Sequence, residues 1–162
     1  MPRVFVGIGS NIDRERSVRA GVAELKQTYG EVQLSDVYES DAVGFEGDAF
    51  YNLVVAFDTD ESVDQVVANL SGIEDRHGRL RNGERFAART LDLDLLLFGD
   101  AIIKAENYHV PRDEIPRYAF VLWPLSEMAP QMKHPETGGS FADMWEKFDK
   151  RNQALRPIAF EW

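Results

Sequence analysis

Two aspartates separated by one residue give the sequence its clearest chemical signal. Asp92 and Asp94 lie in the segment RTLDLDLLLF, whose alternating leucines predict a β-strand over 91–98. Alternate side chains of a strand share a face, so the two carboxylates should point the same way, with Cα atoms about 7 Å apart. This spacing suits one or two hard cations such as Mg²⁺, which take one or two carboxylates together with phosphate oxygens and water. The alternative is a half-exposed strand whose outer face happens to be acidic.

The rest of this strand is expected to keep the same alternation. One face would be filled by Leu91, Leu93, Leu95 and Leu97. The aspartate face would continue as apolar through Leu96 and Phe98. The carboxylates would therefore lie where a covered face of the sheet meets a cleft.

A run of arginines leads directly into the aspartate pair. Within 76–89 the only acid is Glu84, and the arginines are Arg76, Arg79, Arg81, Arg85 and Arg89. Guanidinium groups bind phosphate oxygens through paired hydrogen bonds, so this run beside two carboxylates predicts a polyphosphate cradle. The alternative is a solvated loop that balances nearby acids. Together the two features favour phosphoryl-type transfer.

Other phosphate-binding motifs are incomplete. The segment GIGSN (7–11) follows a predicted strand, but it lacks the Lys of a Walker A loop and the third Gly of G-x-G-x-x-G. We interpret it as a turn where small residues let another segment approach closely. His77 and His134 pair with no nucleophile or second metal ligand in the sequence pattern, so neither is expected to act in catalysis.

Aromatic and amide side chains offer a site for a flat substrate. Asn52 presents a donor and an acceptor together, which is what reading the edge of a heteroaromatic ring requires. Rings able to stack on such a substrate are Phe50, Phe86 and Phe120. Each of these rings alone is more commonly a core residue.

The elements that would position these residues follow the order βαββαβ. The patterns predict a strand at 3–7, a helix through 18–29, strands at 32–38 and 52–57, a helix over 63–73 and a strand at 91–98. Gly30 would end the first helix, Asp60 or Ser62 would cap the second, and Gly78 would end it. This order predicts an α+β fold with a ferredoxin-like βαββαβ core, an antiparallel sheet and helices packed on one face.

The remaining residues should add C-terminal elements to this core. We expect irregular structure after Ile102, short helices near 120–128 and 140–148, and an edge strand at 158–160. The segment 39–48 is rich in Gly, Asp and Glu and predicts a loop. Neither an internal repeat nor a linker divides the sequence, so a single domain is expected over 1–162.

Composition limits the function classes. The chain has 162 residues, a formal net charge of −10 and no cysteine, which excludes disulfides, thiolate metal sites and Cys nucleophiles. The acidity argues against nucleic-acid binding, so an anionic substrate would have to meet a local basic patch. Neither a membrane-length apolar run nor a signal-peptide pattern is present, and a cytoplasmic location is expected.

Several segments taken together resemble one enzyme family. They are GIGSN, FYN, the run GRLR…ER…RTLDLDLLLFG, VPR and AFVLWPLSEMAP, in the family's order and spacing from about Val4 to Pro130. The set resembles 6-hydroxymethyl-7,8-dihydropterin pyrophosphokinase of folate biosynthesis, and the RTLDLD element is highly specific to that family. The resemblance implies transfer of a pyrophosphoryl group from ATP to the hydroxymethyl oxygen of 6-hydroxymethyl-7,8-dihydropterin, with release of AMP.

The same resemblance implies roles for individual residues. Asp92 and Asp94 would hold two Mg²⁺ ions between the ATP phosphates and the attacking hydroxyl, and would act in catalysis with Arg79 and Arg89. The pterin site would comprise Ser40, Val43, Phe50, Asn52 and Phe120. The ATP site would comprise Glu74, Arg85, Phe86, Arg89, Leu95, Arg112 and Arg117. Segments 44–47 and 78–88 would be lids over the substrates. The implied partners are ATP and the reduced pterin, with a monomer favoured over a homodimer.

The sequence departs from the family pattern at several positions, most of them on the ATP side. Arg112 replaces a His that contacts ATP phosphate in the family; the other departures are Asp41, Asn82, Asp113 and Tyr118. Three alternatives therefore stay open. One is a diverged relative that binds a pterin-like heterocycle with little transfer, another is an enzyme for a different acceptor, and the third is an acidic interaction domain.

Overall fold

The computed structural model describes residues 1–41, 49–77 and 91–162. Its elements in chain order are β1 (Arg3–Ser10), α1 (Arg14–Tyr29), β2 (Gln33–Leu34), β3 (Val37–Ser40), β4 (Phe50–Asp58), α2 (Val63–Arg76), β5 (Asp92–Phe98), β6 (Ile103–Lys104), β7 (His109–Val110), α3 (Ala119–Met128), α4 (Phe141–Lys147) and β8 (Leu155–Ile158).

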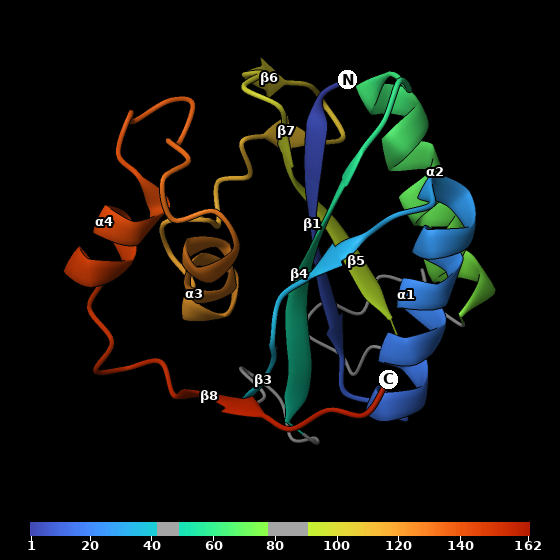
Figure 1. Cartoon of the computed structure of the whole chain (residues 1–162), viewed down its shortest axis with the longest axis horizontal. Helices are drawn as coiled ribbons and strands as arrows, with labels where there is room; N and C mark the ends of the chain where they lie inside the picture. The colour runs from blue at the N-terminus through green and yellow to red at the C-terminus, as the bar shows by residue number, and fades with distance from the viewer. Residues whose placement is uncertain (42–48, 78–90) are drawn as a thin grey trace.

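One antiparallel sheet organises the described chain. Its strands run in the order β5-β1-β4-β3-β8, and the short β2 also pairs with β4. Figure 1 shows α1 and α2 on one side of this sheet and α3 and α4 on the other. In each βαβ unit, the two strands joined through a helix are not adjacent in the sheet. Strand β4 lies between β1 and β3, and β1 lies between β4 and β5, which is the ferredoxin-like arrangement. The predicted fold class is confirmed.

The predicted helices form because their apolar residues recur on one face. Val18, Val22 and Leu25 of α1 are buried against the sheet, and Gly30 ends the helix at φ 80°, as predicted. In α2 the capping oxygen is that of Ser62, which accepts the Gln65 N–H at 3.2 Å. The helix ends at Arg76, ahead of the predicted stop at Gly78, which lies outside the described residues.

Helices α3 and α4 make a second layer, on the sheet face opposite α1 and α2 (Figure 1). Tyr38 of β3 packs on Trp123 of α3 with ring centroids 4.9 Å apart, and Trp123 stacks on Trp145 of α4 at 5.2 Å. Ser140 caps α4 by accepting the Asp143 N–H at 3.2 Å. Aromatic burial therefore holds both helices on this side of the sheet.

The first strand is longer than predicted. We expected a turn over 7–11, but β1 continues through Ser10, with Gly9 opposite Asn52 and Ser10 opposite Tyr51. A Cβ placed on Gly9 would lie 3.4 Å from the Asn52 Oδ1 and 3.8 Å from the Phe50 ring. These are ordinary van der Waals distances, so the close-approach interpretation of GIGSN stays a prediction, whereas its interpretation as a turn is wrong.

The predicted strand over 32–38 is divided in two. Between β2 and β3, the Ser35 backbone N–H donates to the Val54 carbonyl at 2.9 Å and the Ser35 Oγ accepts the Val54 N–H at 2.9 Å. A hydroxyl thus replaces a backbone carbonyl in the ladder, and the strand breaks there. The expected loop over 39–48 begins later than predicted, because Glu39 and Ser40 belong to β3; residues 42–48 lie outside the described chain.

A bulge changes the face of two residues in β5. Val6 pairs with Leu95 and Phe5 with Leu97, so Leu96 is the extra residue. Leu96 and Leu97 both pack in the α3 layer, while Phe98 packs in the α1–α2 layer, so the predicted faces of Leu97 and Phe98 are wrong. Asp92 and Asp94 precede the bulge and keep the predicted alternation.

Two C-terminal features differ from expectation. The final strand covers Leu155–Ile158 rather than 158–160, because it pairs antiparallel with Val37–Ser40. The segment after Ile102, expected to be irregular, contains the two-stranded β6–β7 sheet. Strands of two residues are too short to show an alternating pattern, so the sequence carries no signal for them.

Candidate active site

Asn52, predicted to bind the pterin, and Asp92, predicted to bind the metal, lie in one row across three neighbouring strands, with Gly9 between them. Gly9 pairs with Asn52 on one side and with Asp92 on the other, and Gly7 pairs with Asp94. Paired residues project to the same face, so the amide and both carboxylates share the α3 face. Neighbouring strands are about 4.8 Å apart, which separates the Cα atoms of Asn52 and Asp92 by roughly 10 Å. Gly9, which has no side chain, lies between them, beside the Asn52 Oδ1 and the Phe50 ring.

The carboxylate end of the row is half-buried, and Arg112 lies beside it. The Asp94 Oδ1 lies 3.5 Å from the Arg112 Nη2, and the same nitrogen lies 3.0 Å from the Glu114 Oε1. Burial and the neighbouring Asp92 raise the pKa of Asp94, and Arg112 only partly opposes this rise. Two neighbouring carboxylates that repel each other would be stabilised by a bound divalent cation.

No cluster of three or more metal-ligating side chains occurs in the described ranges 1–41, 49–77 and 91–162. Asp92 and Asp94 would therefore hold a cation as a pair. Mg²⁺ is commonly bound in this way, because it keeps several waters and takes the oxygens of substrate phosphates. The donor set thus fits Mg²⁺ arriving with a nucleotide.

The amide end of the row is fixed by a neighbouring hydroxyl. The Asn52 Nδ2 donates to the Ser40 Oγ at 2.7 Å, and Asn52 is buried at 6% exposure. Ser40 pairs with Phe50 in the β3–β4 ladder, so these two residues and Asn52 face the same side. The structure therefore brings together three of the residues predicted to bind a pterin.

Phe120 lies farther along the same face. It is in the first turn of α3, and its ring stacks on Tyr118 with centroids 5.2 Å apart. Val43, the remaining residue of the predicted pterin set, lies outside the described chain.

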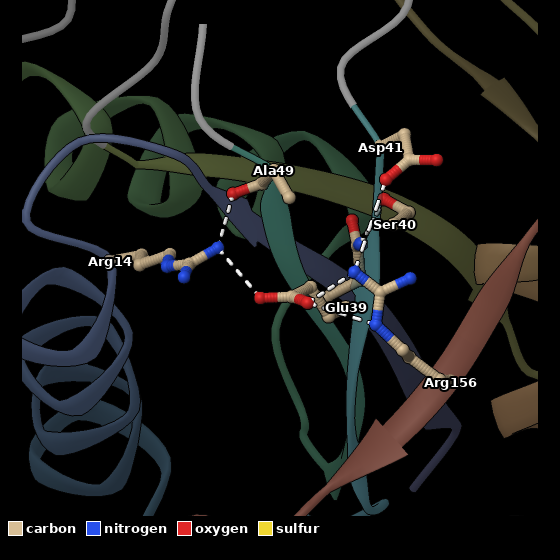
Figure 2. A network of polar contacts seen from close by, with 7 residues as sticks. Arg14, Glu39, Ser40, Asp41, Ala49 and Arg156 are labelled. Atoms are coloured by element: carbon tan, nitrogen blue, oxygen red, sulfur yellow. Dashed lines mark hydrogen bonds and ion pairs between the residues drawn. The ribbon is translucent and has the colours of Figure 1, made fainter.

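A charged network surrounds Ser40 (Figure 2). Arg14 of α1 lies 3.0 Å from the Glu39 Oε2 and donates to the Ala49 carbonyl at 2.8 Å. Arg156 of β8 pairs with the other oxygen of Glu39 and lies 3.9 Å from the Asp41 Oδ1. The carboxylate of Glu39 thus ties together α1, β3 and β8 beside the amide end of the row. Sequence reasoning missed these residues, since only the register Glu39↔Arg156 brings them together.

The residues predicted to bind ATP lie in different parts of the structure. Glu74 of α2 is 3% exposed and its Oε2 accepts the Leu93 N–H at 2.8 Å, on the edge strand of the sheet. Leu95 is buried in the α1–α2 core, on the face opposite the aspartates. Arg117 lines a hollow of about 580 Å³ between the start of α3 and α4, and its backbone carbonyl accepts the Gln153 Nε2–H at 2.8 Å.

The arginine-rich cradle falls outside the described residues. The candidates concerned are Arg79, Arg81, Arg85, Phe86 and Arg89. Arg76 ends α2 and donates to Glu24 of α1, which places it in a helix–helix contact. His77 pairs with the same carboxylate, and His134 accepts backbone N–H groups, so both have structural contacts.

Comparison with known proteins decides the family. The sequence model described as 7,8-dihydro-6-hydroxymethylpterin-pyrophosphokinase (HPPK) matches residues 5–130, which is most of the chain. The chain belongs to the HPPK family. Membership confirms the predicted resemblance, and with it an enzyme that is a diphosphotransferase of folate biosynthesis. A diverged pterin-binding module is not favoured.

Curated relatives share about a third of their residues with this HPPK-family chain. The 2-amino-4-hydroxy-6-hydroxymethyldihydropteridine pyrophosphokinase of Pseudomonas aeruginosa is 35% identical over 138 residues, which cover 83% of this chain and 85% of that protein. The protein of the same name from Bacillus subtilis is 36% identical over 137 residues, covering 82% and 81%.

A solved structure supports the fold. The crystal structure of Plasmodium falciparum HPPK-DHPS with SDX-DHP matches with a TM-score of 0.70 at 14% identity. The match covers 94% of this chain and 47% of that one, so the chain spans about half the length of the solved protein. At this identity the likeness concerns the ferredoxin-like fold alone.

Proposed function

We propose that the chain transfers the β,γ-pyrophosphoryl group of ATP to the hydroxymethyl oxygen of 6-hydroxymethyl-7,8-dihydropterin, producing AMP. The observation that carries the proposal is the row Asn52–Gly9–Asp92 on one face of the sheet, in a chain of the HPPK family. At one end of the row, the Asn52 amide would hydrogen-bond to the edge of the pterin; at the other end, Asp92 would bind a cation.

The carboxylate end would handle the phosphates. Asp92 and Asp94 would hold two Mg²⁺ ions that arrive with ATP, and the metal would neutralise the charge on the transferred group. By family resemblance, Arg79 and Arg89 would add positive charge in catalysis. Such a transfer depends on positioning and charge neutralisation more than on a strong base.

The amide end would orient the acceptor. Because one N–H of Asn52 donates to Ser40, the second N–H and the carbonyl oxygen remain for the edge of the pterin. Phe50 and Phe120 would stack on its faces and Ser40 and Val43 would line the pocket. The span of roughly 10 Å from Asn52 to Asp92 would place the hydroxymethyl group, at the far end of the bicyclic ring, toward the metal.

We further propose a nucleotide site formed by Glu74, Arg85, Phe86, Arg89, Leu95, Arg112 and Arg117, as the family pattern implies. The protein would act as a single domain and a monomer in the cytoplasm, with no nucleic-acid partner, in keeping with its charge of −10. None of the helices in the described ranges has the length and apolar character needed to cross a bilayer.

Product analysis tests the proposed reaction. The protein is incubated with MgATP and 6-hydroxymethyl-7,8-dihydropterin, and the nucleotide products are separated by chromatography. We expect AMP, formed only when both the pterin and Mg²⁺ are present. Formation of ADP would identify an ordinary kinase, and absence of turnover with retained pterin binding would identify a binding module; either result overturns the proposal.

A further inference from the structure

Arg112 occupies the space beside the aspartate pair and is held there on three sides. Its guanidinium lies 3.5 Å from Asp94 and 3.0 Å from Glu114. Its backbone N–H donates to the Leu96 carbonyl at 2.9 Å, on the strand that carries the aspartates. The backbone of Arg112 is therefore fixed relative to Asp94 whatever its side chain does.

The guanidinium is only partly satisfied in this position. The Nε atom is buried and has no hydrogen-bond partner within the described part of the chain. Burial alone would lower the pKa of Arg112, but the carboxylates of Asp94 and Glu114 outweigh it and raise the pKa. A buried donor without an acceptor is costly, so the hydrogen bond from Nη2 to Glu114 and the attraction to both carboxylates hold the group there.

We infer that Arg112 is an internal counter-cation of the aspartate pair, which competes with a divalent metal for Asp94 when nucleotide is absent. A metal ion on Asp94 and a guanidinium 3.5 Å from the same oxygen repel each other, so the metal must displace the arginine. The inference rests on the proposed function only in taking Asp92 and Asp94 as the cation site.

Nucleotide would relieve this competition. Phosphate oxygens offer Arg112 paired acceptors, including one for its unpartnered Nε, while they complete the metal's ligand set. Glu114 keeps a second ion pair for the guanidinium when it leaves Asp94. The arrangement therefore favours loading of metal together with nucleotide over loading of metal alone, and Arg112 is a positioning residue for that step.

Binding of Mn²⁺ alone to the nucleotide-free protein tests this directly, with free Mn²⁺ measured by electron paramagnetic resonance. Arg112→Gln removes the competing charge and should bind Mn²⁺ about fivefold more tightly or better. Arg112→Lys keeps a cation and should stay near wild type. Arg151→Gln is the matched control, because Arg151 is exposed and pairs with Asp149, and it should change nothing.

Two further variants test whether a change in Mn²⁺ affinity comes from a folding defect or from metal bound at another site. Glu114→Gln leaves Arg112 with Asp94 alone, so Mn²⁺ should bind about twofold more weakly or worse. Asp94→Asn should abolish the binding in every background. Equal Mn²⁺ affinity in wild type and Arg112→Gln, an equal gain in Arg151→Gln, or unchanged binding in Glu114→Gln overturns the inference.

The outcome is separable from that of the proposed reaction. A chain that formed no AMP would still show the predicted differences in Mn²⁺ affinity if Arg112 competes for Asp94. Conversely, a chain that formed AMP but bound Mn²⁺ equally with and without the Arg112 guanidinium would contradict this inference alone.

Discussion

Asn52 and Asp92 pair with the same residue, Gly9, from opposite sides of β1. This relationship places the amide that we propose reads the pterin and a carboxylate that we propose binds the metal on one sheet face, two strand spacings apart. Because regular backbone pairing sets the separation, the two ends of the site cannot move independently. The pairing of Gly9 with both residues therefore sets the distance between the two ends of the site.

The first prediction concerns Gly9, which lies between Asn52 and Asp92 in the strand pairing. Gly9→Ala puts a Cβ 3.4 Å from the Asn52 Oδ1, an ordinary contact, and should change the KM for pterin by no more than about twofold. Gly9→Val adds two γ-carbons between Asn52 and the aspartates and should raise that KM about tenfold, equivalent to ~1.4 kcal/mol. Steady-state kinetics with the pterin varied measures both. Equal KM values for the two variants would contradict the assigned position of the substrate.

The second prediction concerns the hydroxyl that orients Asn52. Ser40→Ala removes the 2.7 Å hydrogen bond and should raise the KM for pterin about five- to tenfold, since such bonds contribute ~1 kcal/mol, with the KM for ATP unchanged. Ser140→Ala is the matched control: it removes a helix cap and should cost about 1 kcal/mol of stability while leaving both KM values alone. A rise in both KM values for Ser40→Ala would argue for a general distortion instead.

The third prediction concerns the network around Glu39. Arg156→Gln removes one of the two arginines that hold this carboxylate, which lies next to Ser40 in β3. We expect the KM for pterin to rise about two- to fivefold and the effect to shrink at high salt in comparison with wild type, because the pair is partly exposed. Kinetics at low and high ionic strength measure this. Arg151→Gln, the same chemical change at an exposed residue that pairs with Asp149, should show neither effect.

The fourth prediction concerns the pH dependence of folding. Burial lowers the pKa of His134 below its ordinary 6.5, and its Nδ1 accepts the N–H groups of Glu136 and Thr137 at 3.1 and 3.3 Å. Because the folded state holds the neutral ring, this stabilisation is fully present above pH 6.5 and is lost as the pH falls through the folded pKa.

The variant His134→Leu tests whether the contribution of His134 to folding stability decreases as the pH falls. At pH 7.5 it should destabilise the protein by about 1–2 kcal/mol, and the difference from wild type in urea unfolding should be smaller at pH 5. His109→Leu, at an exposed position, should stay within about 0.5 kcal/mol of wild type at both values. A difference for His134→Leu that grows toward pH 5 would contradict the assignment.

Sequence patterns predicted the parts of the fold that depend on local periodicity. The spacing of Val18, Val22 and Leu25 predicted α1, and the alternation through Asp92 and Asp94 placed both carboxylates on one face. The faces of Leu97 and Phe98 were wrong because a bulge in β5 depends on pairing with β1, which the strand's own sequence does not encode.

The site was predictable where single residues have distinctive chemistry and not where contacts depend on register. Asn52 and the aspartates were predicted by type and by family resemblance. The Glu39–Arg156 pair joins residues 117 positions apart and follows only from the antiparallel pairing of β3 with β8. The contact of Arg112 with Asp94 likewise arises because the chain after β7 returns to the edge of β5.

Phosphorus NMR of the pterin product, made by wild type and by Asp94→Asn, tests the central claim most directly. Wild type should yield AMP and a pterin diphosphate with two coupled phosphorus resonances. Asp94→Asn should lose at least about 10²-fold in rate without a fall in unfolding temperature, because it removes a metal ligand and not a core contact. A pterin monophosphate with ADP, or near-wild-type diphosphate formation by Asp94→Asn, would contradict the account.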